Sequence, residues 1–239
     1  MPSDSNVPGP ASGDVQSQIL HAFNFRHACK LFDPGHRISE GEFDTLLQTA
    51  RLSPSSFGME PWQLLVIQTP EKRELLRKFL WGANGASYGT AGQLGTASHF
   101  CIFLAHTGAT MQHHSEYLQR HLQEVKQLPP EVIAFYNDAY QKFQEHDFHI
   151  ENDRHIVDWS ARQAYIALAN MMTAAALMGI DSCPIEGFEM DGISTLLEQH
   201  FGIDPKLLQP AVMVAFGYRA EDPAFPKTRR DMADIVTWA

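Results

Sequence analysis

The chain has 239 residues, of which 44% are hydrophobic and 19% charged, a composition that can supply one sizeable apolar core. Its formal net charge is −10 at pH 7, which argues against a nucleic-acid-binding surface or attachment to an anionic membrane. The three cysteines, Cys29, Cys101 and Cys183, have no CxxC spacing, and their number is odd. Neither a disulfide framework nor a zinc site is therefore predicted. These features favour a reducing compartment, and we expect a cytoplasmic protein.

Residues 1–14 are rich in Pro, Ser and Gly and lack the basic start and apolar centre of a targeting peptide. We expect them to form a disordered tail. Residues 15–239 contain neither an internal repeat nor a Gly/Ser linker and are predicted to form a single domain. The longest apolar stretch, 164–178, is shorter than the ~20 residues that a bilayer span needs, so no membrane partner is expected.

Apolar periodicity and turn residues predict the elements of the first half of the chain. Ser39 and Glu42 have the spacing of a capping box, and Pro70 is suited to the first position of a helix. A continuous apolar run at 99–105 predicts a strand that is buried on both faces. The elements expected here are helices at 15–23, from 39 and at 70–81, strands at 63–69 and 99–105, and a Gly-rich loop at 82–95.

The second half begins with a polar helical region, about 110–150, which Pro129 and Pro130 divide and which we expect to be a surface excursion beside a site. A long helix at 153–178 follows, with Asp153 as its N-cap and Gly179 at its end. The second half of this helix is apolar all round, which predicts burial on every side, in the core or in a dimer interface.

Strands at 181–185 and 211–218 bring the expected number of strands to about four, and helices outnumber them, which predicts an α+β layered fold. The tail at 221–239 has little apolar periodicity of its own. We expect it to pack on another surface, such as a second subunit.

Three separated motifs carry a resemblance to a known family. They are Arg26-His27-Ala28-Cys29-Lys30, Pro184-Ile185-Glu186-Gly187-Phe188 and Pro226-Lys227-Thr228-Arg229, with Ser53-Pro54-Ser55-Ser56 and Pro61-Trp62 between the first two. In this order they resemble the FMN-dependent nitroreductase family, which includes the oxygen-insensitive NAD(P)H nitroreductases and dihydropteridine reductases. The resemblance implies a three-layer fold with a mainly antiparallel central sheet, and a long central helix at the interface of a homodimer.

Basic residues are the first set that the resemblance assigns. It implies that Arg26, Lys227 and Arg229 contact the phosphate of FMN, and that Lys30 lies at the N1 side of the flavin ring. A phosphate dianion suits such groups, because an arginine fork can grip two oxygens. Ala28 stands where the family commonly has Ser or Thr, so one hydroxyl donor worth on the order of 1 kcal/mol is missing. The alternative is a solvated basic pair after a helix and a basic tail.

The turn after the second helix is the next set. The resemblance implies that Pro54, Ser55 and Ser56 cover the flavin from the partner subunit, together with Gly58. Gly58 and Glu60 stand where polar Asn and Gln are usual, so the donors of this loop differ from the family's. Phe57 follows the serines and is expected to line the acceptor slot. The alternative is that Ser-Pro-Ser-Ser is an ordinary turn.

The resemblance implies that Pro184 and Ile185 lie against one face of the ring and that the Glu186 and Gly187 N–H groups point at N5 and O4. A Cβ at Gly187 would obstruct such a close approach. Gln163 matches a position near the ring, with an interior glutamine bonded to backbone as the alternative. Gln93, or less favourably Thr90, is the expected ring contact from the Gly-rich loop. The complete set of expected cofactor residues is Arg26, His27, Ala28, Lys30, Pro54, Ser55, Ser56, Gly58, Gln93, Gln163, Pro184, Ile185, Glu186, Gly187, Lys227 and Arg229.

No metal site is expected, because the histidines at 113–114 and 146–155 have neither an HExxH spacing nor a Cys partner.

The resemblance implies a ping-pong enzyme that passes a hydride from NADH or NADPH through flavin N5 to a nitroaromatic, quinone or similar small acceptor. Two alternatives stay open. One is a specialised family reductase or dehalogenase, and the other is a non-catalytic flavin-binding redox sensor.

Overall fold

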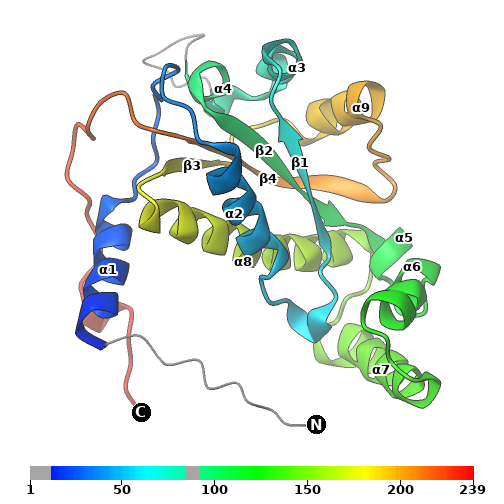
Figure 1. Cartoon of the computed structure of the whole chain (residues 1–239). Coiled ribbons are helices and arrows are strands. Elements are labelled where there is room, and N and C mark those ends of the chain that lie inside the picture. Colours follow the sequence, from blue (N-terminus) through cyan, green and yellow to red (C-terminus); the bar gives the residue numbers. More distant parts are fainter. Residues whose placement is uncertain (1–11, 84–91) are drawn as a thin grey trace.

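A four-stranded antiparallel sheet forms the centre of this computed structural model, which describes residues 12–83 and 92–239 (Figure 1). Residues 1–11 of the expected tail, and residues 84–91 with Thr90, lie outside the described part. The strands run in the order β1-β2-β4-β3. Their bounds are β1 Trp62–Ile67, β2 His99–His106, β3 Asp181–Ile185 and β4 Leu208–Gly217. The α+β class and the antiparallel sheet predicted from the sequence are confirmed.

Helices cover both faces of the sheet, giving the three layers. Their bounds are α1 Ser12–Phe25, α2 Glu40–Arg51, α3 Pro70–Leu76, α4 Gln93–Thr96, α5 Gly108–Met111, α6 Glu116–Arg120, α7 Pro130–Lys142, α8 Asp153–Leu177 and α9 Met190–Phe201. One core lies between the sheet and α3, α4 and α9, and a second lies between the sheet and α2 and α8. The middle of β2 is buried on both faces, as its apolar run predicts, because it contributes to both cores.

Of the two N-terminal capping signals predicted from the sequence, one is present and one is corrected. The Ser39 hydroxyl accepts from the Glu42 N–H at 3.3 Å and Glu42 bonds back to the Ser39 N–H, so the predicted capping box is present. The N-cap of α8 is Asn152, and the prediction of Asp153 is wrong. Asn152 accepts from the His155 N–H at 3.0 Å, whereas the Asp153 carboxylate is drawn away to the Gly108 N–H, 2.5 Å distant, at the start of α5.

Helices α1 and α8 both expose apolar residues. α1 begins at Ser12, three residues before the predicted start, and its Ile19, Leu20 and Phe23 are exposed. α8 packs on α2 and the sheet, but Ile166 and Leu177 on its other face are 38% and 52% exposed. Burial on every side of α8, which the sequence predicts in the core or in a dimer interface, is therefore incomplete within a single chain.

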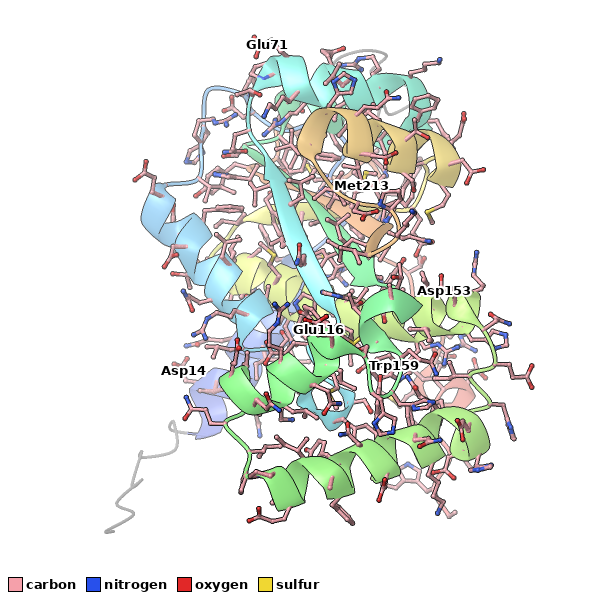
Figure 2. The ribbon with its side chains drawn as sticks, turned by 90° about the vertical axis from the view of Figure 1, so that its right-hand side faces the viewer. Asp14, Glu71, Glu116, Asp153, Trp159 and Met213 are labelled. Carbon is pink, nitrogen blue, oxygen red and sulfur yellow. The ribbon has the colours of Figure 1, made fainter. Side chains whose placement is uncertain are left out.

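The excursion between β2 and α8 is less polar inside than its sequence predicts. It is divided at Pro129 and Pro130, as predicted, with Pro130 in the first turn of α7. Its helices enclose a third core, into which Trp159 projects from α8 toward α7 (Figure 2). The aromatic rings of Tyr140 and Phe143 lie 6.0 Å from Trp159, so this core fixes the excursion against α8.

Candidate functional site

The segment that follows α1 lies along the outer edge of β3. Ala28 forms a parallel bridge with Ser182, and the Cys29 N–H donates to the Ser182 carbonyl at 3.3 Å. A second bridge joins Phe32 to Arg219, just after β4. These contacts bring the Arg26–Lys30 motif beside Pro184, although more than 150 residues separate the two motifs in the sequence.

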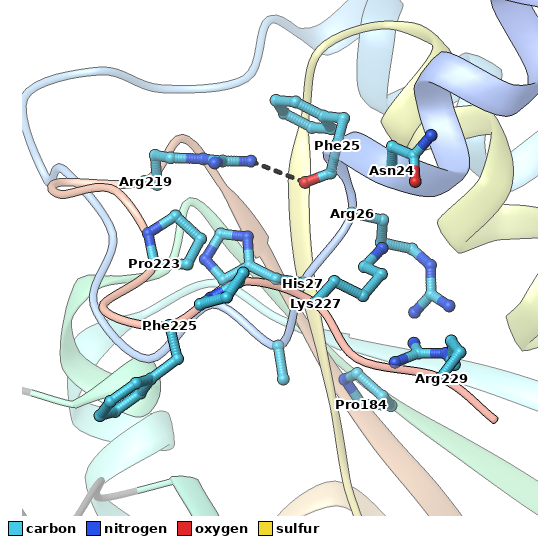
Figure 3. A pocket seen from close by; sticks show the side chains of 12 residues that line it. Asn24, Phe25, Arg26, His27, Pro184, Arg219, Pro223, Phe225, Lys227 and Arg229 are labelled. Carbon is cyan, nitrogen blue, oxygen red and sulfur yellow. Dashed lines mark hydrogen bonds between the residues drawn. The ribbon is translucent and has the colours of Figure 1, made fainter.

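A pocket of about 590 Å³ opens at this edge (Figure 3). Three sequence segments line it: the end of α1 with the residues after it, Pro184 of β3, and the tail between Arg219 and Arg229. The residues expected at a cofactor that meet here are Arg26, His27, Ala28, Pro184, Lys227 and Arg229. Figure 3 shows Arg26, Lys227 and Arg229 on one side of the pocket and Arg219 on the other.

Three cations of this pocket converge without an acidic partner. Across residues 12–83 and 92–239, no ion pair involves Arg26, Lys227 or Arg229. The pKa of Lys227 is lowered, first by its partial burial and then by the charges of Arg26 and Arg229. Like charges repel, so this arrangement suits a bound anion that offsets the repulsion among the three.

A fourth cation, Arg219, is neutralised. Its guanidinium lies 2.7 Å from Oδ1 of the buried Asp181, and it also donates to the Phe25 carbonyl at 3.0 Å. The Phe25 ring stacks on it at 4.3 Å. This residue fixes the end of α1 to the start of β3, and no motif in the sequence marks it. His27 Nδ1 lies 3.6 Å from Asp181, but burial and Arg219 lower the pKa of His27, so its imidazole is neutral near pH 7 and forms no ion pair.

Lys30 and Gln93 converge on a residue that the sequence analysis missed. Lys30 Nζ lies 3.7 Å and Gln93 Nε2 3.4 Å from Sγ of Cys183. Gln93 is fully buried, and its Oε1 has no hydrogen-bond partner in the described structure. An unsatisfied buried acceptor costs about 1–3 kcal/mol. In the sequence, the one indication that Cys183 belongs to the site is that it directly precedes Pro184 of the motif.

The loop after β3 is held by two contacts. The Gly82 N–H donates to the Gly187 carbonyl at 2.7 Å, and a Cβ built on Gly187 would lie 2.6 Å from the Gly82 Cα. The close packing of Gly82 therefore requires a glycine at position 187, in addition to the expected close approach of a ligand. The Tyr165 hydroxyl of α8 donates to Glu186 Oε1, and burial, then Glu186, raises the pKa of Tyr165. Ile185 is buried in the core that α3, α4 and α9 cover.

The turn at 54–58 does not line this pocket. The Ser56 N–H donates to Gln163 Oε1 at 2.9 Å. Gln163 is therefore hydrogen-bonded to backbone, as in the alternative interpretation of this residue. Ser55 Oγ accepts from the Glu60 N–H at 2.9 Å. Phe57 has a left-handed backbone, φ +56°, and its ring packs 5.1 Å from Phe143 in the third core. Pro54 and Gly58 belong to the same distant turn. One chain therefore does not bring the turn to the cations.

Two further features of the described residues bear on function. No group of three or more His, Cys, Asp and Glu side chains is arranged to hold a metal ion within them. None of the helices in this described part has the length and apolarity of a membrane span.

Comparison with known proteins identifies the family. The Nitroreductase family profile matches residues 24–218. The chain is 49% identical over 226 residues to YfkO of Bacillus subtilis (strain 168), provisionally named an NAD(P)H nitroreductase, with 94% of this chain and 99% of that one covered.

Two solved structures share the fold. A provisionally assigned nitroreductase of Exiguobacterium sibiricum 255-15, solved in complex with FMN, has a TM-score of 0.70 and 24% identity, covering 92% of this chain and 97% of that one. A nitroreductase-like protein of Streptococcus mutans has a TM-score of 0.73 and 20% identity, covering 94% and 99%. The chain belongs to the Nitroreductase family and has its fold.

Proposed function

We propose that this chain is an FMN-dependent oxidoreductase that uses NADH or NADPH to reduce nitroaromatics, quinones or similar small acceptors in the cytoplasm. The convergence of Arg26, Lys227 and Arg229, with no acidic partner in the described structure, carries the proposal. It provides a site for a dianion in a protein whose formal net charge is −10. The NAD(P)H nitroreductase name of YfkO and the FMN in the Exiguobacterium structure support it.

The residues present fit an FMN. The three cations would hold its phosphate, and His27 and Ala28 would contribute backbone beside them. Lys30, Gln93, Pro184 and Ile185, with the N–H groups of Glu186 and Gly187, would surround the ring. The buried Gln93 Oε1 is an acceptor in need of a donor. Bound FMN would supply hydride chemistry at N5, in a ping-pong exchange between a nicotinamide and an acceptor. The protein's part is to orient both reactants and to place charge.

The active unit is a homodimer with FMN at its interface. Three observations support this: the open apolar face of α8, the exposed face of α1 that packs beside it, and a tail in which Trp238 is 93% exposed. A second copy would cover these faces. It would also bring the 54–58 turn and Phe57, which lie away from the pocket in one chain, to the flavin of its partner.

The absorption spectrum of the purified protein, with and without NADPH under anaerobic conditions, tests the proposal. We expect a flavin spectrum that bleaches with NADPH and returns when a quinone or nitroaromatic is added, with steady oxidation of NADPH. A yellow protein that shows no steady turnover would support a redox sensor. Turnover restricted to one acceptor type, or halide release from a halogenated aromatic, would support a specialised reductase or dehalogenase. A colourless protein that does not take up FMN would contradict the proposal.

A further inference from the structure

Cys183 is the meeting point of two side chains that come from distant segments. Lys30 follows α1, 153 positions earlier, and Gln93 opens α4, 90 positions earlier. Each directs a nitrogen at the Cys183 sulfur, at 3.7 and 3.4 Å. Both are residues that the proposed function places at the flavin ring. Cys183 itself has no assigned role in that function.

The backbone around Cys183 holds the sulfur rigidly. Cys183 pairs with Ala215 of β4, and its neighbour Ser182 is bridged to Ala28. The side chain is fully buried in the core that α3, α4 and α9 cover. Lys30, by contrast, is an exposed residue on a flexible four-carbon stem and has no ion pair with any described residue. The fixed sulfur therefore limits where the ammonium can lie.

The thiol contacts both the ammonium and the amide, and it leaves part of the hydrogen-bonding capacity of each group unused. Sulfur is a weak acceptor, so neither nitrogen is bound as tightly as it would be by a carboxylate. Lys30 keeps two N–H donors, and Gln93 keeps one N–H and the buried, unpartnered Oε1. Donors beside an acceptor are complementary to the C=O, N–H, C=O edge of an imide such as the flavin pyrimidine ring.

We propose that Cys183 is a positioning residue, whose thiol sets the places of the Lys30 ammonium and the Gln93 amide and thereby tunes the preference of the site for reduced over oxidised flavin. The proposal rests on the proposed function, because it needs FMN in this pocket. The mechanism is electrostatic: an ammonium held close to the ring favours the reduced anionic form over the neutral oxidised form.

The test compares Cys183→Ala with Cys101→Ala. Cys101 is also fully buried in the sheet, on β2, but contacts neither donor and belongs to the other core. The two substitutions remove the same atom, so thermal melting reports the packing loss of each. The decisive measurements are the midpoint potential of bound FMN, by anaerobic dye-coupled titration, and the dissociation constant of oxidised FMN.

For Cys183→Ala we expect the affinity for reduced relative to oxidised FMN to fall about tenfold, which is ~30 mV for two electrons. Cys101→Ala should leave this ratio unchanged. Cys183→Ser retains an acceptor for both nitrogens and should stay within about twofold of the unaltered protein. Cys183→Val, which has no acceptor and is close to cysteine in size, supplies the measurement if the alanine variant does not fold, and the same tenfold fall is expected for it. In a Lys30→Met background, Cys183→Ala should shift the potential less, because the ammonium is already gone.

Equal potentials in Cys183→Ala, Cys101→Ala and the unaltered protein would overturn this proposal and leave the proposed function standing. So would equal shifts in the two alanine variants, because they would report packing alone. A protein that binds no FMN in any of these forms would overturn the proposed function, and this proposal with it.

Discussion

At the residue scale, the pocket separates cations that are neutralised within the chain from cations that are left for a ligand. Arg219 forms an ion pair with the buried Asp181, and this ion pair helps to join α1 to β3. Arg26, Lys227 and Arg229 have no such partner in the described structure, and partial burial, followed by the charges of Arg26 and Arg229, lowers the pKa of Lys227. The two kinds of residue lie in one pocket and should respond differently to substitution.

Arg229→Ala should weaken FMN binding about ten- to hundredfold, because a lost charge-assisted hydrogen bond costs about 1.5–3 kcal/mol. Fluorescence titration of the apoprotein with FMN measures this. Arg154→Ala is the matched control, since Arg154 is a surface arginine of α8 whose ion pair within the described residues is with Asp158. Equal affinities in the two variants would remove Arg229 from the phosphate site.

Lys30→Met should leave much of the FMN bound and lower its midpoint potential by a few tens of millivolts, since ~30 mV corresponds to about 1.4 kcal/mol for two electrons. Loss of the ammonium removes a charge that favours the reduced ring. Potential and affinity should be measured beside those of Arg229→Ala. If Lys30→Met released the flavin without a change in potential, the division of roles between phosphate and ring would be wrong.

At the element scale, the excursion and the 54–58 turn form one unit. Lys126 Nζ donates to the Phe57 carbonyl at 2.5 Å, and His121 Nε2 lies 3.1 Å from the Gly58 carbonyl. These contacts hold Phe57 in its left-handed conformation, which a non-glycine residue rarely adopts. The turn is therefore rigid and suited to present a fixed wall.

Phe57→Ala should change the ranking of acceptors more than the retention of FMN, because the ring is expected at the acceptor slot of a partner chain and not at the phosphate. It should also lower the melting temperature, since the ring packs on Tyr140 and Phe143. Turnover with several nitroaromatics and quinones measures the ranking. Phe135→Ala, at an exposed ring of α7, is the control. An unaltered ranking with a lowered melting temperature would make Phe57 a packing residue only.

Stability should fall in acid because of His106, at the end of β2. Burial lowers the pKa of His106 to about 4, and its Nδ1 lies 3.0 Å from Thr110. The unfolded chain takes up this proton near pH 6.5 and the folded chain only near 4, so stability is lost as pH falls through that window. His106→Gln should make the melting temperature less dependent on pH between 6.5 and 4. An unchanged dependence would show that other groups set the acid limit.

At the scale of the whole molecule, one chain leaves apolar residues of α1, α8 and the C-terminal tail exposed. Helices α1 and α8 pack against each other (Figure 1). Both expose apolar residues, and the tail beyond β4 leaves Phe225, Met232 and Trp238 exposed. Exposed apolar residues that gather into a large patch are typical of an interaction surface. A second copy of the chain is the occupant proposed above.

We expect sedimentation to show a dimer at micromolar concentration, with FMN bound. Removal of residues 231–239 should shift the equilibrium toward monomer, because it deletes Met232, Ile235 and Trp238 while sparing the cations of the pocket. Removal of residues 1–9 is the control for loss of a terminus. A folded, flavin-loaded monomer of the intact chain would contradict an obligate dimer.

The sequence by itself determined the elements whose signal is local. The Ser39–Glu42 capping box, the buried run of β2 and the bounds of β3 follow from patterns that a few adjacent residues complete. The fold class followed from the order of these elements, and the family from motifs at Arg26–Lys30, Pro184–Gly187 and Lys227–Arg229. The structure then placed Arg26, Pro184, Lys227 and Arg229 in one pocket.

Only the tertiary structure decided which residues far apart in the chain contact one another. It paired Asp181 with Arg219, brought Lys30 and Gln93 to Cys183, and packed Gly82 on Gly187. It also left Ile166 and Leu177 of α8 exposed, where the sequence pattern predicts burial on every side. The physical reason is common to all of these. Hydrophobic periodicity specifies that a face must be covered, but which side chain or which chain covers it depends on contacts that close only when the whole sheet has formed.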